Sequence, residues 1–449
     1  MTQLTQLSRF GLFDARVPRY TSYPTAPHFT AGVGPQMFGD WIRSIPAGSP
    51  ISLYVHVPFC RRLCWFCACR TQGTTSDAPV RAYVQTLLAE IALLQRQLAP
   101  GIRLSRLHWG GGTPTLLSPD LITTLAGAIL TAIPLAEGGE FSVEIDPNEI
   151  DAPRLDALVS AGMNRASIGV QDFDPLIQKV IGREQGFALT QDVAQMIRAR
   201  GITSLNADIL FGLPHQTVPR IIDSVRKLLS LTPDRVALYG YAHVPWMSRR
   251  QQMIPGDAMP TPEERLALFD AARDLFLADG YDEIGIDHFA RRTDGLAIAA
   301  RTGHLRRNFQ GYTDDRAPIL VGLGASSISR FPQGYAQNAV GTAEHVKAIR
   351  SGHFSIMRGH VFQSDDQLRG RLIECLMCDF KIDPQDLAQF AAPNEIARLL
   401  ADTAAAFPGV VDLTDGVLSI PLKSRALTRI IARSLDVYDQ SKAQHSTAI

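Results

Sequence analysis

Short apolar runs alternate with amphipathic segments between Ile51 and about Phe331. The repeating unit is roughly 30 to 40 residues long, which is typical of βα repeats. After the first apolar run, apolar side chains recur at steps of three and four, namely Val84, Leu87, Leu88, Ile91, Leu94 and Leu98. This spacing predicts a helix with one buried face. The alternation as a whole predicts an α/β fold in which parallel strands form a (β/α) barrel.

The predicted strands end in polar or glycine-rich residues. We expect strands over residues 51–57, 103–109, 141–146, 165–170, 204–211 and 235–239. In a barrel of parallel strands the carboxyl ends share one rim, which carries the active site. The residues expected at that rim are 110–114, 144–147, 171–172, 208 and 241–243. A glycine triplet at 110–112 lets a backbone approach a ligand closely and offers amide donors to a carboxylate, although a tight turn would also explain it.

Both ends of the chain differ from this pattern. Residues 1–50 contain scattered proline and glycine and are predicted to form an arm lying on the barrel, with the aromatic side chains of 10–23 packed. The barrel and its extension are expected over 51–360, and a separate, mostly helical domain over 361–449.

The C-terminal domain is predicted to contain three helices, a hairpin and a last basic helix. The first helix is expected from Ser364, with Gln367 completing a capping box, to about Phe380; the others should start near Asp383 and Pro393. Two apolar runs, 410–413 and 417–420, flank an Asp-Gly pair that favours a hairpin. This order looks like a winged helix. The sequence shows neither a strongly basic patch nor a second DNA-contacting element. We therefore favour a lid over a substrate cavity rather than DNA binding.

Charge and hydropathy exclude several classes of protein. The 44 basic and 44 acidic residues balance, which argues against electrostatic binding to nucleic acid or anionic membrane. The longest charge-free apolar stretch, 121–136, is shorter than the roughly 20 residues that span a bilayer. There is no N-terminal signal segment, so reduced thiols and a cytoplasmic protein are expected.

Four cysteines follow the first predicted strand as CxxxCxxCxC, at Cys60, Cys64, Cys67 and Cys69. Three thiolates can bind three irons of a 4Fe-4S cube and leave the fourth iron open to a small molecule. A zinc site would use two CxxC pairs or histidines, and a disulfide framework suits short secreted chains. Another pair, Cys375 and Cys378, falls inside a predicted helix, where buried thiols are the better interpretation.

Several motifs over nearly the whole chain resemble those of the oxygen-independent coproporphyrinogen III oxidases, a family of radical S-adenosylmethionine (SAM) enzymes of haem biosynthesis. They are residues 19–25, 54–60, 108–115, 144–147, 169–173, 182–185, 211–214, 241–245, 287–290, 308–312 and 335–338. Related radical SAM haem chaperones lack Cys69 and the 19–24 element. The chain departs from the family at Trp65, often Tyr, and at Ala68, often Gly, but both leave the ligand spacing intact.

The resemblance implies a site with one 4Fe-4S cluster and two SAM molecules. It implies that Cys60, Cys64 and Cys67 bind the cluster, and that Tyr54, Gly111 and Glu144 hold the SAM on the open iron with Ile328 near its adenine. The second SAM would be bound by Phe66, Gly112, Thr113, Gln171, Arg183, Asp208 and Ala242. Cys69 and Glu144 would act in catalysis, Cys69 as a proton or hydrogen donor, although a buried thiol is the other interpretation.

The implied reaction converts two propionate side chains of coproporphyrinogen III to vinyl groups through a 5'-deoxyadenosyl radical made from SAM, giving protoporphyrinogen IX. The chain would be a monomer reduced by a donor such as a flavodoxin or ferredoxin. Candidates for binding the substrate carboxylates are Arg19, Arg291, Arg292, Arg306 and Arg307. The alternative is a haem-binding chaperone related to radical SAM enzymes that does not turn over.

Overall fold

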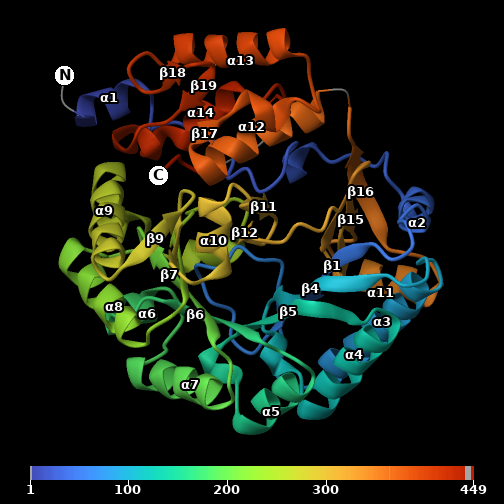
Figure 1. The fold of residues 1–449 in the computed structure, drawn as a ribbon. Coiled ribbons are helices and arrows are strands. Elements are labelled where there is room, and N and C mark those ends of the chain that lie inside the picture. Colours follow the sequence, from blue (N-terminus) through green and yellow to red (C-terminus); the bar gives the residue numbers. More distant parts are fainter. Residues whose placement is uncertain (1–2, 364, 440–445) are drawn as a thin grey trace.

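The computed structural model contains a twelve-stranded sheet (Figure 1). The structure describes residues 3–363, 365–439 and 446–449. The strand order is β16-β15-β14-β13-β1-β4-β5-β6-β7-β8-β10-β9. The strands from β13 to β8 in this order run parallel, whereas those added at either edge are antiparallel. Among the described residues the two edge strands do not pair with each other, so the sheet is a partial barrel.

Six of the seven parallel strands in the described residues were predicted, although the strand that ends at Ile145 begins six residues earlier than expected, and the strand at 320–323 was not predicted. The seven are β1 Pro50–Val57, β4 Arg103–Gly111, β5 Leu135–Ile145, β6 Arg165–Gln171, β7 Ser204–Phe211, β8 Arg235–Gly240 and β13 Leu320–Leu323. The antiparallel edges are β9 Tyr281–Ile284, β10 His288–Arg291, β14 Ile328–Phe331, β15 Gly334–Asn338 and β16 Ile356–Val361. Two short pairs lie outside the sheet: β2 Phe59–Cys60 with β3 Gln72–Gly73, and β11 Arg306–Asn308 with β12 Gly311–Thr313.

Helices cover the outer face of the sheet (Figure 1). They are α3 Ala78–Gln95, α4 Pro119–Ala132, α5 Ala152–Ser160, α6 Pro175–Val180, α7 Phe187–Ala199, α8 Val218–Ser230, α9 Pro262–Ala278 and α11 Thr342–Arg350. Helix α10, Gly295–Arg301, lies instead over the centre of the barrel in this view. Single 3₁₀ turns occur at Ala26–His28, Pro114–Leu116, Pro147–Glu149, Arg249–Met253 and Gly256–Ala258. No helix among the described residues is both long and apolar enough to cross a membrane.

The predicted periodicity of α3 is confirmed, but its bounds shift. Val84, Leu87, Ile91 and Leu94 are buried in the main core, where they pack against the sheet. The helix begins earlier, because Pro79 is well suited to a first turn, and it ends before Leu98.

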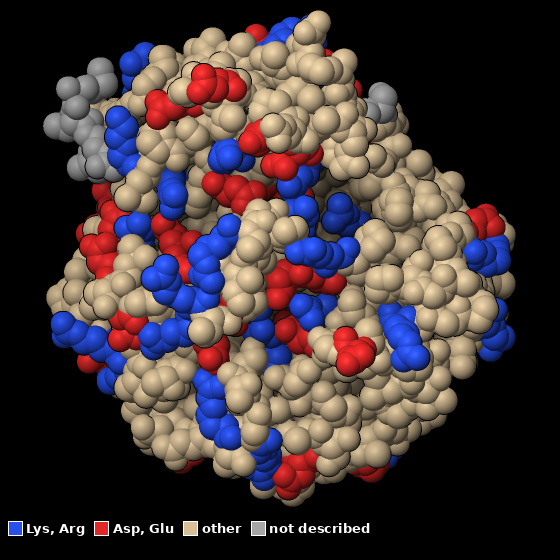
Figure 2. All heavy atoms as spheres, viewed as in Figure 1, with Lys and Arg blue, Asp and Glu red and all other residues tan. Residues whose placement is uncertain are grey.

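The amino-terminal half of the barrel interior is charged rather than apolar. Arg165 pairs with Glu140 at 2.7 Å and approaches Asp294 at 3.7 Å, while Arg235 pairs with Asp294 at 2.5 Å. Burial opposes ionisation of Glu140, but Arg165 and neighbouring arginines outweigh it and lower its pKa. Figure 2 shows charged side chains of both signs around the central hollow of this face. Neither sign dominates this face, in agreement with the balanced composition.

The C-terminal domain has the predicted winged-helix-like order, with corrections. Its elements are α12 Asp366–Asp379, β17 Lys381–Ile382, α13 Pro393–Ala406, β18 Asp412–Thr414, β19 Val417–Ser419 and α14 Thr428–Ser434, with 3₁₀ turns at Pro384–Leu387 and Leu422–Leu427. The helix expected near Asp383 is therefore only one 3₁₀ turn, capped by Asp383, whose side chain accepts from the Gln385 amide. The predicted hairpin is confirmed: β18 and β19 pair around Asp415 and Gly416, both with positive φ.

The predicted start of α12, a capping box from Ser364, falls on a residue that the structure does not describe. Ser364 lies outside the described residues, and the N-cap position is Asp365, which makes no side-chain cap hydrogen bond. The side chain of Gln367 donates instead to the Pro332 carbonyl oxygen. Cys375 and Cys378 are buried in this helix, as predicted.

The N-terminal arm packs against both the barrel and the C-terminal domain, whereas the prediction placed it on the barrel alone. Helix α2, Pro35–Arg43, buries Phe38 and Ile42 in the barrel core. By contrast Leu12, Phe13 and Tyr20, which follow α1 Gln3–Arg9, belong to the core of the C-terminal domain. The aromatic side chains of the arm are thus packed, but mostly against elements from the other end of the chain.

Candidate active site

The cysteine loop lies at the carboxyl rim of the barrel and is held from several sides. It follows β1 directly, and the amide of Trp65 donates to the Ile181 carbonyl oxygen at 2.9 Å. Ser248 Oγ donates to the Cys67 carbonyl oxygen at 3.0 Å, and the Arg70 carbonyl oxygen lies 3.0 Å from Nε2 of His56. These contacts fix the backbone of the loop, so that the positions of its thiols are determined by the barrel.

The thiols of this loop have unusual electrostatics. A hydrogen bond from the Cys69 thiol lowers the pKa of Cys67 to about 6, and the same bond raises the pKa of Cys69. Burial raises the pKa of Cys64, although Arg183 opposes this, with its Nη1 atom 3.7 Å from Cys64 Sγ. Burial also raises the pKa of Cys60 to about 11. Arg183 therefore supplies positive charge beside thiols that must ionise to bind a metal.

The thiols of the loop have the number and spacing to hold an iron–sulfur cube. In the part of the chain that the structure describes, no three His, Cys, Asp or Glu side chains converge to hold one metal ion. In a cube each thiolate binds a different iron, so three thiolates do not need to converge on one point. All six cysteines are free thiols, three of them only partly buried on one loop, namely Cys60, Cys64 and Cys67.

The glycine triplet is held close to both the loop and a carboxylate. Gly111, with φ of 112°, donates its amide to Glu144 Oε2 at 3.0 Å. A Cβ added at Gly110 would lie 2.6 Å from Glu144, and one at Gly112 2.6 Å from the Phe59 carbonyl oxygen. Strands β1, β4 and β5 are neighbours, which brings these residues together. The triplet therefore lets the Glu144 side chain approach Gly110 and the Phe59 backbone approach Gly112, and is not merely a turn.

Glu144 is ionised and faces two aromatic side chains. Burial opposes its ionisation, but hydrogen bonds from His108 Nε2 at 3.3 Å and from Gly111 outweigh burial and lower its pKa. Tyr54 stacks on the His108 ring, with centroids 5.8 Å apart, and its hydroxyl lies 3.0 Å from His56 Nδ1. The imidazole of His108 also contacts Ser142 at 2.6 Å. His56 and His108 were not predicted as site residues, although both lie in the quoted motifs.

The residues predicted around a second SAM are brought to the same rim, with one exception. Gln171 ends β6 with φ of 70°. Gln251, which was not predicted, donates to the carbonyl oxygens of both Phe66 and Ala242, at 2.8 and 3.0 Å, and so joins two that were. Thr113 donates its amide to the Phe59 carbonyl oxygen at 2.8 Å.

Asp208 is the exception, because it lies in the middle of β7 and not at its end. It lines a cavity of about 230 Å³ inside the barrel, together with Glu144, Tyr239 and His288. Burial raises the pKa of Asp208 to about 6. Ile328 begins β14, beside Gly322, which pairs with Tyr54 on β1.

The candidate arginines separate into two groups. Arg291 pairs with Asp279 and Arg292 is largely exposed, so both lie on the surface. Arg307 is buried, stacks on Tyr312 and lies 4.0 Å from Asp287, whereas Arg306 lies on the same short strand and lines another cavity. Arg19 donates to the Gly240 carbonyl oxygen at 2.6 Å, at the end of β8. Arg19 therefore lies near the carboxyl rim, and Arg307 donates to the Arg19 carbonyl oxygen at 3.4 Å.

Comparison with known proteins agrees with this geometry. Residues 54–228 match the model of the radical SAM superfamily. The chain is 66% identical to the oxygen-independent coproporphyrinogen III oxidase of Paracoccus denitrificans over all of both chains, and 36% identical to that of Escherichia coli K12 over 95% of this chain and 94% of the other. The solved structure of coproporphyrinogen III oxidase from Escherichia coli, described as a radical SAM enzyme, superposes with a TM-score of 0.89 at 34% identity, covering 95% of this chain and 100% of that one.

High identity over the full length, the same fold and the cysteine loop at the carboxyl rim thus point in one direction. The chain belongs to the oxygen-independent coproporphyrinogen III oxidase family of radical SAM enzymes.

Proposed function

We propose that Cys60, Cys64 and Cys67 hold the 4Fe-4S cluster with which this enzyme oxidises coproporphyrinogen III without oxygen. The observation that supports this most is the position of three partly buried thiols on one loop beside Arg183. A cluster with three thiolate ligands is anionic, and a guanidinium next to it offsets that charge. Bound there, the cluster and SAM supply the electron and the 5'-deoxyadenosyl radical for removing hydrogen from a propionate carbon.

Tyr54, Gly111 and Glu144 are proposed to hold the SAM nearest the cluster, with Ile328 beside its adenine. Glu144 stays ionised in this site and so can accept hydrogen bonds from an ammonium group. Gly111 and His108 hold its two oxygens, which orients the carboxylate. The absence of a Cβ at Gly111 leaves room for the His56 ring, because an added Cβ would lie 2.5 Å from it.

Phe66, Gly112, Thr113, Gln171, Arg183, Asp208 and Ala242 are proposed to line the second SAM site. Support comes from Gln251, which connects Phe66 to Ala242, and from Arg183, which lies between Cys64 and Asp146. Arg183 already forms an ion pair with Asp146 at 3.1 Å, so a bound ligand would share the Arg183 guanidinium with Asp146.

Cys69 is proposed to handle a proton or hydrogen atom during the reaction and not to bind iron. Its side chain is exposed, and its amide lies 3.4 Å from Cys67 Sγ. A propionate arm of the substrate would reach the barrel cavity next to Glu144, whose wall includes Tyr239 and His288. Arg19, Arg306 and Arg307 are proposed as partners of the propionate carboxylates.

Other features of the enzyme are also proposals. All six thiols are free, which suits a cytoplasmic enzyme. A small redox protein such as a flavodoxin or ferredoxin would reduce the cluster, and the chain would act as a monomer of three parts, 1–50, 51–360 and 361–449, with the last as a lid. Neither nucleic acid nor a membrane is expected as a partner.

The test compares two conservative variants, Cys64→Ser and Cys69→Ser, after anaerobic reconstitution with iron and sulfide. Cys64→Ser should lose most bound iron and all SAM cleavage. Cys69→Ser should keep iron and the visible absorption of the cluster yet lose protoporphyrinogen production. If Cys64→Ser kept a full cluster, the ligand assignment would be wrong. A wild-type protein that bound haem but neither cleaved SAM nor consumed coproporphyrinogen III would favour the chaperone alternative.

A further inference from the structure

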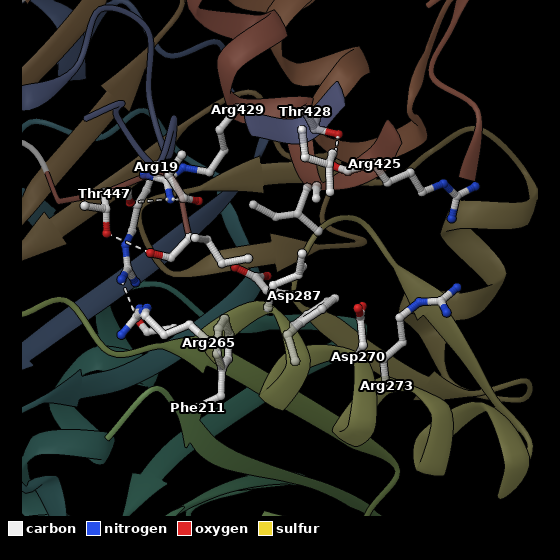
Figure 3. Close-up of a pocket in the computed structure, with 18 of the residues that line it drawn as sticks. Arg19, Phe211, Arg265, Asp270, Arg273, Asp287, Arg425, Thr428, Arg429 and Thr447 are labelled. Atoms are coloured by element: carbon white, nitrogen blue, oxygen red, sulfur yellow. Dashed lines mark hydrogen bonds between the residues drawn. The ribbon is translucent and has the colours of Figure 1, made fainter. Parts of the chain in front are cut away.

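A second cavity, which we call the arginine cavity, lies between helix α9 of the barrel and the C-terminal domain (Figure 3). Its volume is about 420 Å³, within the range of small-molecule sites. Apolar walls come from Phe211, Phe269 and Phe380, and one end is lined by Arg19, Arg265 and Arg429. None of its lining residues is shared with the barrel cavity beside Glu144. It is therefore separate from the space assigned above to the substrate.

Three cations gather at one end of the arginine cavity without a carboxylate partner. Arg19 donates to Gly240, and Arg265 donates to Gly212 and Tyr241, in each case to the carbonyl oxygen. Arg429 donates to the carbonyl oxygens of 17, 18, 447 and 448. Within the described residues, none of the three forms an ion pair with an acidic group.

The opposite end of the arginine cavity is different, because its charges are matched. Arg273 and Arg425 share Glu283, at 2.8 and 2.9 Å. Both arginines at this end are thus ion-paired, although Nε of Arg425 has no hydrogen-bond partner among the described residues. The three arginines at the other end hydrogen-bond to carbonyl oxygens instead. Figure 3 shows the two ends, with Arg273 on one side and Arg19, Arg265 and Arg429 on the other.

Unused hydrogen-bond donors mark the positive end further. Arg265 is only 8% exposed, and its Nε atom has no partner among the described residues. The same holds for Nε and Nη1 of Arg307, also 8% exposed, which lines the same cavity. A buried donor without an acceptor is costly, and a buried cation more so.

In addition to burial, the positive charge of Arg19 changes the pKa values of the other two arginines. Burial, and then the charge of Arg19, lowers the pKa of Arg265 to about 10 and that of Arg429 to about 9. Asp287 lies nearby, but it already contacts His288 Nδ1 at 2.6 Å and approaches Arg307. An added anion would relieve this repulsion and accept the unused donors.

We propose that the arginine cavity binds a small amphipathic oxyanion, whose carboxylate or phosphate is held by Arg19, Arg265 and Arg429 and whose apolar body lies against Phe211, Phe269 and Phe380. Guanidinium groups bind both kinds of oxyanion in a two-pronged geometry. The aromatic walls exclude a purely hydrophilic anion, and the acidic groups at the far end exclude a second negative charge there. Arg19 and Arg307 are also proposed above as propionate partners, whereas Arg265 and Arg429 are not. No residue assigned to the cluster or to SAM lines the arginine cavity, so failure of this site would leave those assignments intact.

The test is anaerobic titration calorimetry of the full-length holoenzyme with octanoate, octyl phosphate and octanol. We expect octanoate or octyl phosphate to bind once per chain, and octanol to bind at least about tenfold more weakly, because it lacks the charge. The better of the two anions identifies the head group. Equal binding of octanol and both anions would overturn the proposal, as would no binding of any.

Substitutions in the arginine cavity test where the anion binds. Arg265→Gln and Arg429→Gln should each weaken anion binding by at least about tenfold, whereas the matched control Arg273→Gln, in the same cavity but paired with Glu283, should change it less than about twofold. If Arg429→Gln failed to fold, Ala426→Trp would replace it, since it fills the cavity and leaves the arginines in place. Undiminished binding in Arg265→Gln or in Ala426→Trp would refute the site.

Discussion

The Nη1 atom of Arg183 lies 3.7 Å from the sulfur of Cys64. The same guanidinium also contacts Asp146 and the Gly169 carbonyl oxygen, so it joins the cysteine loop to two strand ends. We predict that Arg183→Ala lowers SAM stoichiometry from about two toward one and reduces porphyrinogen turnover at least about a hundredfold, because a shielded charge-assisted contact is lost. Anaerobic equilibrium dialysis and product analysis measure both.

The control for Arg183 is Arg200→Ala. Arg200 pairs with the exposed Asp156 and should leave both quantities unchanged. Iron content should stay within about a factor of two in Arg183→Ala, since the three thiolates remain. Two bound SAM molecules and full turnover in Arg183→Ala would contradict its assignment to the second site.

Gly112→Ala should disturb the start of the cysteine loop. Its Cβ would lie 2.6 Å from the Phe59 carbonyl oxygen, which is backbone and cannot rotate away. We expect a loss of stability of about 1 to 3 kcal/mol, together with reduced iron incorporation. Gly127→Ala in α4 is the control, because nothing lies within 4 Å of its added Cβ, and it should stabilise the helix by up to about 1 kcal/mol. Thermal unfolding and iron analysis compare the two; equal behaviour would disprove the steric argument.

Glu144→Gln should keep the cluster and weaken the binding of the first SAM. The amide preserves the shape of the side chain and can still accept from Gly111, but the negative charge is lost. We expect SAM affinity to fall at least about tenfold with iron content unchanged, measured by equilibrium dialysis. Glu137→Gln, an exposed position on the same strand, serves as control. Unchanged SAM affinity in Glu144→Gln would rule out a direct contact with the ammonium group.

Glu90 makes stability depend on pH. It is 1% exposed, accepts from the Gly324 amide and from Asn338, and burial raises its pKa to about 8 from an ordinary value of 4.5. A carboxyl whose folded pKa is raised stabilises the fold below its unfolded pKa, and this contribution is lost as pH rises through about 8. Nearby His345, with its pKa lowered to about 4 by burial, titrates below this window.

We therefore predict that the melting temperature of Glu90→Gln falls less than that of the wild type between about pH 6 and about pH 9. Thermal unfolding by circular dichroism at several pH values tests this. The exposed Glu263→Gln should follow the wild-type curve. Parallel curves for Glu90→Gln and the wild type would mean that Glu90 is ionised in the fold.

Most of the barrel could be predicted because buried parallel strands are nearly continuous apolar runs. β7 agrees with its prediction at both ends. The antiparallel edges, such as β9 and β16, could not be predicted, since they are short and their pairing joins distant segments. The helix expected near Asp383 is a single turn, because local capping chemistry does not distinguish a turn from a helix.

In the site, too, local patterns could be predicted, whereas contacts between distant segments could not. Cysteine spacing and the glycine triplet are local signals and placed the loop correctly beside Glu144. Gln251 carries no local signal, because its role is to bridge two carbonyl oxygens that only the fold brings together. Asp208 was expected at the rim although the predicted strand 204–211 continues past it, and in the structure it lines the cavity inside the barrel.

The packing of the N-terminal arm has a consequence for the order of events on the ribosome. Tyr20 hydrogen-bonds Asp436 across 416 positions of sequence, and Gln6 bonds Gly409 across 403. Leu12 and Phe13, made first, share a core with Ile431 of α14, made last. Because these partners are synthesised late, the apolar side chains of the arm stay uncovered while the barrel residues are made. The arm can complete its packing only after α14 has been synthesised.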